Sequence, residues 1–176
     1  MTKTAETWIN ASIKEDLDLL KHLKKIKAPG INDVDPDEDG WTALYHAVYN
    51  NNKSVVDFLL KCGADVNQLD DDKGTVLFWA ANKGKVPIIK LLLKKGANVD
   101  VIDVDGNNVL WTAVAMGRTE VISVLLDAGA DPLLVNKEGL TIFDRRTTKS
   151  SGIFLDKVKD KYTKMKKVGK FKELLR

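Results

Sequence analysis

The 176-residue sequence contains few side chains that could act as nucleophiles or bind a soft metal. One cysteine, Cys62, and two histidines, His22 and His46, make up the whole set. A catalytic cysteine needs a base beside it, and nothing in the spacing brings either histidine close to Cys62. Three such ligands also fall short of a dedicated zinc site. We therefore expect Cys62 to be a half-exposed residue without a catalytic role.

Paired carboxylates are the other group that could carry chemistry. Asp71 and Asp72 could bind a hard cation, but they lie beside a glycine in a turn-like segment, where a solvated turn is the better interpretation. The sequence contains no glycine-rich phosphate loop and no Gly-x-Ser-x-Gly motif. We predict that the protein is not an enzyme and uses no cofactor and no metal.

The composition is that of an ordinary globular chain, with 44% hydrophobic and 30% charged residues. A single cysteine cannot form an internal disulfide, which favours a reducing compartment. Met1 to Leu20 are polar and acidic, unlike a signal peptide, and no apolar run is long enough to span a membrane. We expect a cytoplasmic protein, with the nucleus as the alternative.

A period of 33 residues dominates the chain between about residues 40 and 143. The same residue types return at this step in several positions. The series are Thr42, Thr75, Asn108 and Thr141; Leu44, Leu77, Leu110 and Phe143; Ala47, Ala80 and Ala113; and Gly63, Gly96 and Gly129. Each series indicates one position of a common structural unit.

Every unit follows one plan. A turn signal such as Asp39-Gly40 precedes a short helix with a Thr or Asn that can cap it. A break at Asn51, Gly84 or Gly117 separates this helix from a second one with apolar residues at helical spacing. A glycine then ends the second helix as a left-handed cap. One unit cannot bury its apolar face alone, so the units must stack into a continuous core.

These motifs resemble the ankyrin repeat family. The family pattern is matched by Gly40-Trp41-Thr42-Ala43-Leu44-Tyr45-His46-Ala47 and by Leu59-Leu60-Lys61-Cys62-Gly63-Ala64-Asp65. The likeness covers about Ala5 to Arg146. The chain departs from the pattern at the histidine slot, which holds Tyr45, Phe78, Trp111 and Asp144, and at one turn glycine, which Lys73 replaces. We expect aromatic packing to take over the role of that histidine, with Tyr45, Phe78 and Trp111 in the core.

The resemblance implies an all-α ankyrin-repeat solenoid with hairpin loops and a C-terminal capping helix. The expected domains are a degenerate N-terminal capping repeat, in which Trp8 and Ile9 pack, then three full repeats, a partial repeat and a basic helical extension. Their boundaries are 5–36, 37–69, 70–102, 103–135, 136–146 and 147–176.

The resemblance also implies a non-enzymatic module that binds a protein partner through a concave face of turn tips and first helices. Trp41 and Trp79 occupy slots that face outward in the family, and the tips are acidic, which suits a basic segment with an apolar anchor. The expected contact residues are Glu38, Asp39, Trp41, His46, Tyr49, Asn50, Asp71, Asp72, Trp79, Asn82, Lys83, Asp105, Asn107, Thr112 and Met116.

The overall net charge of +3 hides a strong division along the chain. Residues 1–144 carry a net charge of −6, whereas residues 145–176 carry +9. We interpret Phe154, Leu155, Val158, Tyr162 and Met165 as the apolar face of a helix that caps the last repeat. The alternative is a membrane- or nucleic-acid-binding helix.

We expect a small, free-standing, monomeric protein that acts as an adaptor or inhibitor. An antidote to a bacterial toxin is the alternative within the same class. Leu59 with Asp65-Val66-Asn67 is also similar to the pattern that ankyrin asparaginyl hydroxylases modify, so modification of Asn67 stays open.

Overall fold

The computed structural model describes residues 3–144, 152, 155–156 and 158–160, with side chains from residue 8 onward. Contacts divide the chain into an N-terminal unit, Met1–Asn98, and a C-terminal unit, Val99–Arg176. The N-terminal unit contains α1 (Lys3–Ile13), α2 (Leu17–Lys25), α3 (Ala43–Tyr49), α4 (Lys53–Lys61), α5 (Val76–Asn82) and α6 (Val86–Lys94). The C-terminal unit contains α7 (Val109–Ala115) and α8 (Thr119–Asp127).

Left-handed residues make the sharp turn between the two helices of each pair. Glu15, Asn51, Gly84 and Gly117 have φ values of 55°, 60°, 70° and 65°. The break expected at Asn51, Gly84 and Gly117 is therefore confirmed. After the second helix of each pair, Gly63, Gly96 and Gly129 also have positive φ, as predicted for left-handed caps.

Helix caps differ from one repeat to the next. The side chains of Asp16 and Asn52 accept hydrogen bonds from the first turns of α2 and α4. Thr42 and Thr75 stand at the predicted N-cap positions of α3 and α5 but make no capping hydrogen bond with their side chains. Asn108 does cap its helix, since its side-chain oxygen accepts a hydrogen bond from the backbone N–H of Trp111.

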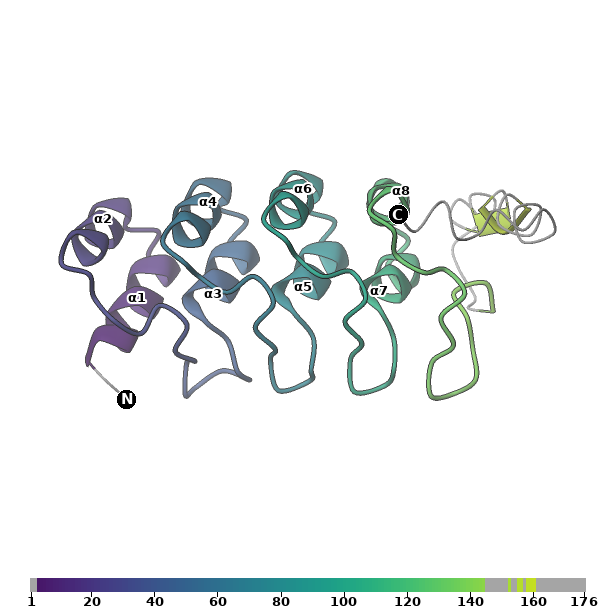
Figure 1. The fold of residues 1–176 in the computed structure, drawn as a ribbon, viewed down its shortest axis with the longest axis horizontal. Coiled ribbons are helices and arrows are strands. Elements are labelled where there is room, and N and C mark those ends of the chain that lie inside the picture. The colour runs from purple at the N-terminus through teal and green to yellow at the C-terminus, as the bar shows by residue number, and fades with distance from the viewer. Residues whose placement is uncertain (1–2, 145–151, 153–154, 157, 161–176) are drawn as a thin grey trace. The chain divides into compact units, whose positions relative to one another are not determined.

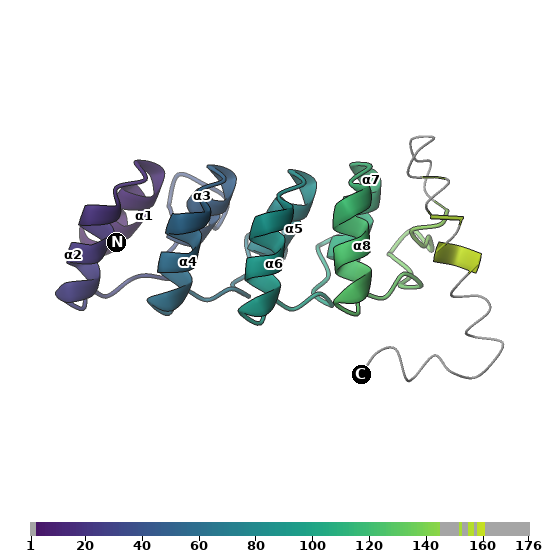
Figure 2. The same ribbon diagram turned by 90° about the horizontal axis from the view of Figure 1, so that it is seen from above.

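The core of the N-terminal unit lies between two rows of helices (Figures 1 and 2). One row contains α1, α3 and α5, and the other contains α2, α4 and α6. Leucine and isoleucine side chains from both rows are fully buried, including Leu44, Leu59, Leu77, Ile88 and Leu92. Burying such side chains stabilises a protein by about 1.5–3 kcal/mol each, so the stacked rows supply the stability that a single pair lacks.

The structure also confirms the burial predicted for Trp8, Ile9 and the three aromatic residues of the histidine slot. Trp8 and Ile9 are buried in α1, and Trp8 donates a hydrogen bond from its indole N–H to the carbonyl oxygen of Ala28 at 3.4 Å. Tyr45, Phe78 and Trp111 are each 9% exposed or less, as expected for the slot that usually holds histidine.

Side-chain amides join successive loops of the N-terminal unit. The Asn32 amide oxygen accepts a hydrogen bond from the backbone of Asp65 at 2.8 Å. Asn67 repeats the arrangement one step later, accepting from the backbone of Asn98 at 2.8 Å and donating to the carbonyl oxygen of Gly96 at 3.0 Å. These bonds tie together the neighbouring loops that lead from each second helix into the next hairpin.

The C-terminal unit continues from α8 into a further hairpin and a capped turn. The Asp144 carboxylate accepts from both the backbone N–H and the hydroxyl of Thr141, and these bonds hold the pKa of Asp144 below its usual value. Of the predicted C-terminal apolar face, Leu155 and Val158 are buried, which fits the cap interpretation. Phe154, Tyr162 and Met165 lie outside the described residues.

Candidate functional site

Two hairpins beside the first helices form the frame of the candidate site. Single bridges pair Val34 with Thr42 and Leu69 with Thr75. The two tips touch each other, since the backbone N–H of Asp71 donates to the carbonyl oxygen of Asp39 at 3.3 Å. Gly40 permits this contact, because a Cβ at its position would lie 2.8 Å from the Asp71 carboxylate and its φ is +75°.

Lys73 takes the equivalent turn position in the second hairpin. Its φ is 61°, close to the 75° of Gly40 and the 79° of Gly106. The turn glycine that the period predicts is therefore replaced by a lysine with the same backbone conformation. The following glycine, Gly74, is buried against the carboxylate of Asp70.

Tyr45 ties α3 to the second hairpin. Its hydroxyl lies 3.1 Å from the carbonyl oxygen of Gly74 and 3.2 Å from the carboxylate of Asp70. Burial and the nearby Asp70 charge raise the pKa of Tyr45 well above its usual value, so it stays a neutral donor. Burial also raises the pKa of Asp70, partly offset by the hydrogen bonds it accepts from Gly74 and Tyr45. Tyr45 thus supplies a hydrogen bond in the slot that usually holds histidine.

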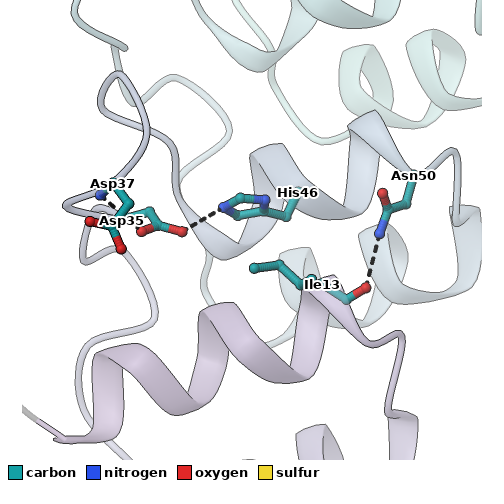
Figure 3. Close-up of polar contacts among 5 residues, drawn as sticks. All are labelled: Ile13, Asp35, Asp37, His46 and Asn50. Atoms are coloured by element: carbon teal, nitrogen blue, oxygen red, sulfur yellow. Dashed lines mark hydrogen bonds and ion pairs between the residues drawn. The ribbon is translucent and has the colours of Figure 1, made fainter.

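His46 ties the same helix to the first hairpin. Its Nε2 lies 3.1 Å from the Asp35 carboxylate (Figure 3). Both side chains are nearly enclosed. Asp35 also accepts from the backbone N–H of Asp37. We expected His46 to contact a partner; in the structure its side chain is buried and holds the hairpin in place, which leaves it little surface to offer.

An aromatic cluster lies on the surface of the N-terminal unit, formed by residues at α3 and α5. We define it as Trp41, Tyr49 and Trp79. Ring centroids are 4.9 Å apart for Trp41 and Trp79, 5.4 Å for Trp41 and Tyr49, and 6.1 Å for Tyr49 and Trp79. Trp41 and Trp79 are half-buried, whereas Tyr49 is 51% exposed. The structure thus brings three of the predicted contact residues into one partly exposed group.

Lys83 adds a cation to this cluster. It is the C-terminal cap residue of α5, and its Nζ lies 5.6 Å from the ring centroid of Trp79 and 5.7 Å from that of Tyr49. The ring faces carry partial negative charge and attract such a cation. Sequence spacing alone gave no sign that Lys83 turns back over the rings.

Carboxylates surround the hairpin tips. Residues 33–39 and 70–72 contain eight acidic residues and no basic one. Five of the acidic side chains are exposed at or beside the tips: Asp37, Glu38, Asp39, Asp71 and Asp72. The other predicted residues of this unit are Asn82, which is half-buried, and Asn50, which is exposed and donates to the carbonyl oxygen of Ile13 at 3.2 Å (Figure 3).

The predicted residues of the C-terminal unit form no such cluster. Asp105 and Met116 are exposed and Thr112 is half-buried. Asn107, expected as a contact residue, is buried instead. Its amide oxygen accepts from the Asn136 side chain at 3.0 Å, and its backbone N–H donates to Asp103 at 2.8 Å. Its polar groups are therefore used inside the unit rather than presented at the surface.

Cys62 lines a pocket of about 280 Å³ with Trp8, Leu23, Lys24, Lys27, Ala28 and Ile31. Burial raises the pKa of Cys62, which lowers its thiolate fraction and hence its reactivity. In the described part of the chain, no group of three or more His, Cys, Asp or Glu residues is placed to hold a metal ion. Nor is any described helix long and apolar enough to cross a membrane.

Paired helices with projecting hairpins define a class of helical repeat proteins that use this scaffold for recognition. The family model for ankyrin repeats, in three copies, matches residues 3–70 and 62–136. The chain therefore belongs to the ankyrin repeat family, and the fold class predicted from the sequence is confirmed. Ankyrin repeats are generally protein–protein interaction modules and are typically non-enzymatic. No curated protein matches the chain.

Proposed function

We propose that the protein binds a protein partner through the hairpin tips and first helices of its N-terminal unit, acting stoichiometrically as an adaptor or inhibitor. The observation that carries this proposal is the aromatic cluster. Trp41, Tyr49 and Trp79 come from two successive repeats and remain partly open to solvent in a chain with a well-formed core. Tryptophan and tyrosine dominate binding hot spots because they bury a large area with few rotatable bonds.

The acidic tips favour a partner with a basic segment that carries an apolar anchor. The anchor would cover the rings while the basic residues face Glu38, Asp39, Asp71 and their neighbours. Exposed charges act mainly on association rate and are screened by salt. Binding to such a partner should therefore weaken as ionic strength rises.

Replacing Trp79 by alanine tests the proposal more cleanly than replacing Trp41. Trp41 contacts Tyr45, His46 and the rest of the cluster, so its loss also disturbs packing around α3. Trp79 contacts the rings of Trp41 and Tyr49 and the Lys83 ammonium. We therefore expect Trp79→Ala to abolish partner binding with little loss of stability.

The test is affinity purification from the native cell with the wild type, Trp79→Ala and the control Ile26→Ala. Ile26 is 55% exposed at the end of α2 and lies outside the cluster. The partner should be retained by the wild type and Ile26→Ala and lost with Trp79→Ala. The proposal fails if Trp79→Ala retains the partner. Loss of the partner supports it only if the melting temperature falls by less than it does in the core variant Leu92→Ala.

A further inference from the structure

The aromatic cluster of the N-terminal unit already holds a cation. Within the described part of the chain, the Lys83 ammonium contacts the rings of Tyr49 and Trp79 and forms no salt bridge. An exposed lysine at a helix end gains most of its solvation by extending into water, because an ammonium is strongly hydrated. The position of Lys83 therefore marks where the ring faces attract positive charge.

A guanidinium group fits this position better than an ammonium. It is planar and weakly hydrated, so it stacks on aromatic faces at a lower desolvation cost, and its fork of N–H donors pairs with carboxylates. Glu38 and Asp39 are exposed carboxylates in the hairpin that leads into Trp41, three and two residues before it. The flat, weakly hydrated face of an arginine can cover the rings in place of the apolar anchor considered above.

Lys83 can give up the position without disturbing the core. Its side chain is exposed, and its backbone caps α5 through main-chain hydrogen bonds that do not involve the ammonium. An incoming cation would repel the ammonium and find the rings partly covered by the lysine stem. Lys83 therefore competes with any cation that a partner brings to the same place.

We propose that the aromatic cluster is the receptor for an arginine side chain in the partner's basic segment, and that Lys83 occupies the guanidinium position in the free protein. This inference rests on the proposed function and names the chemistry of its central contact. Removing the Lys83 charge should strengthen binding of an arginine, whereas removing the Trp79 ring should abolish it.

The test uses the full chain and a short probe peptide, Gly-Arg-Gly-Arg-Gly, with matched peptides in which citrulline or lysine replaces arginine. Citrulline keeps the shape of arginine and removes its charge. Binding is followed at low salt by NMR, using the indole N–H signals of Trp41 and Trp79, with those of buried Trp8 and Trp111 as internal references. The arginine peptide should shift the first two signals, and the citrulline peptide should not.

Lys83→Met supplies the decisive variant, since methionine keeps an apolar stem and removes the charge. Lys90→Met, at an exposed position on α6, changes the net charge by the same amount and serves as its control. We expect Lys83→Met to tighten arginine-peptide binding about two- to fivefold, the size of one exposed cation–π contact. Lys90→Met should leave it unchanged or slightly tighter.

Several results would overturn the arginine receptor. They are equal binding of the citrulline or lysine peptide, equal effects of Lys83→Met and Lys90→Met, or unchanged arginine binding in Trp79→Ala. Loss of the native partner with Trp79→Ala would then still support the proposed function with a different anchor. If the arginine peptide fails to bind and Trp79→Ala also retains the native partner, both proposals are wrong.

Discussion

The hairpin faces of the two units use different side chains on the same backbone frame. In the N-terminal unit, the backbone of Asp71 donates to Asp39, and in the C-terminal unit the backbone of Lys137 donates to Asp105 at 3.0 Å. The position of Trp41 in the first hairpin corresponds to Asn107 two repeats later. One unit therefore presents rings where the other has an amide.

The two faces therefore differ in what they can offer a partner. Asn107 and Asn136 are buried and satisfy each other, so they contribute to stability and offer little to a partner. The aromatic cluster has contacts among its rings but leaves Tyr49 half open to solvent. The backbone frame is the same in both units, and the side chains it carries determine which face can contact a partner.

The tightness of the hairpin frame can be tested with Gly40→Ala and Gly106→Ala. A Cβ on Gly40 would approach Asp71 to 2.8 Å, whereas on Gly106 the nearest atom, the backbone nitrogen of Lys137, would be 3.1 Å away. Both substitutions also place a side chain at positive φ, which costs roughly 1–2 kcal/mol before any clash. We expect Gly40→Ala to lower the free energy of unfolding by about 2–3 kcal/mol and Gly106→Ala by somewhat less. Urea unfolding of both variants measures this, and equal losses would contradict a tighter first contact.

The cap position of the first helix offers a second comparison. Asn108 uses both ends of its amide, accepting from Trp111 and donating to the carbonyl oxygen of Asp131 at 2.9 Å. Thr75 holds the same slot one repeat earlier, and its hydroxyl is buried with no partner among the described residues. We expect Asn108→Ala to cost about 1–3 kcal/mol and Thr75→Val to change stability by no more than about 0.5 kcal/mol. Thermal unfolding distinguishes them, and a large loss in Thr75→Val would mean that its hydroxyl is satisfied after all.

The third prediction concerns the half-buried carboxylate of Asp70 in the second hairpin. Burial raises the pKa of Asp70 in the folded protein, so the folded state holds its proton to higher pH than the unfolded state does. The ionised carboxylate therefore destabilises the fold progressively as pH rises from the unfolded pKa through the raised folded pKa. Asp70→Asn, which cannot ionise, should gain stability relative to the wild type over that interval. Unfolding curves at several pH values provide the measurement, and a constant difference between the two proteins would show that Asp70 does not titrate in this way.

The repeat period predicted the frame correctly because it reports local backbone requirements. The slots of Gly40, Gly106 and even Lys73 all adopt positive φ, since the turn needs that conformation whatever residue fills it. The burial of Tyr45, Phe78 and Trp111 followed from their place next to the repeated leucine.

The side-chain partnerships could not be predicted in the same way. Trp41 and Trp79 are 38 residues apart, so their contact joins different positions of adjacent repeats and depends on how the helices stack. The pairing of His46 with Asp35 and of Asn107 with Asn136 also depends on rotamers and loop paths that a 33-residue period does not contain. For this reason the expected contact residues include two, His46 and Asn107, that the structure buries.

The burial of Trp8 in the N-terminal unit and of Trp111 in the C-terminal unit gives each unit its own spectroscopic reporter. If Trp41 and Trp79 are replaced by phenylalanine, the remaining emission comes from two enclosed indoles, one in each unit. Removing either indole in turn would leave a single-tryptophan protein whose red shift on denaturation follows one unit alone. Superimposable transitions would mean that the chain unfolds as one cooperative body, and separated transitions would give the stability of each unit directly.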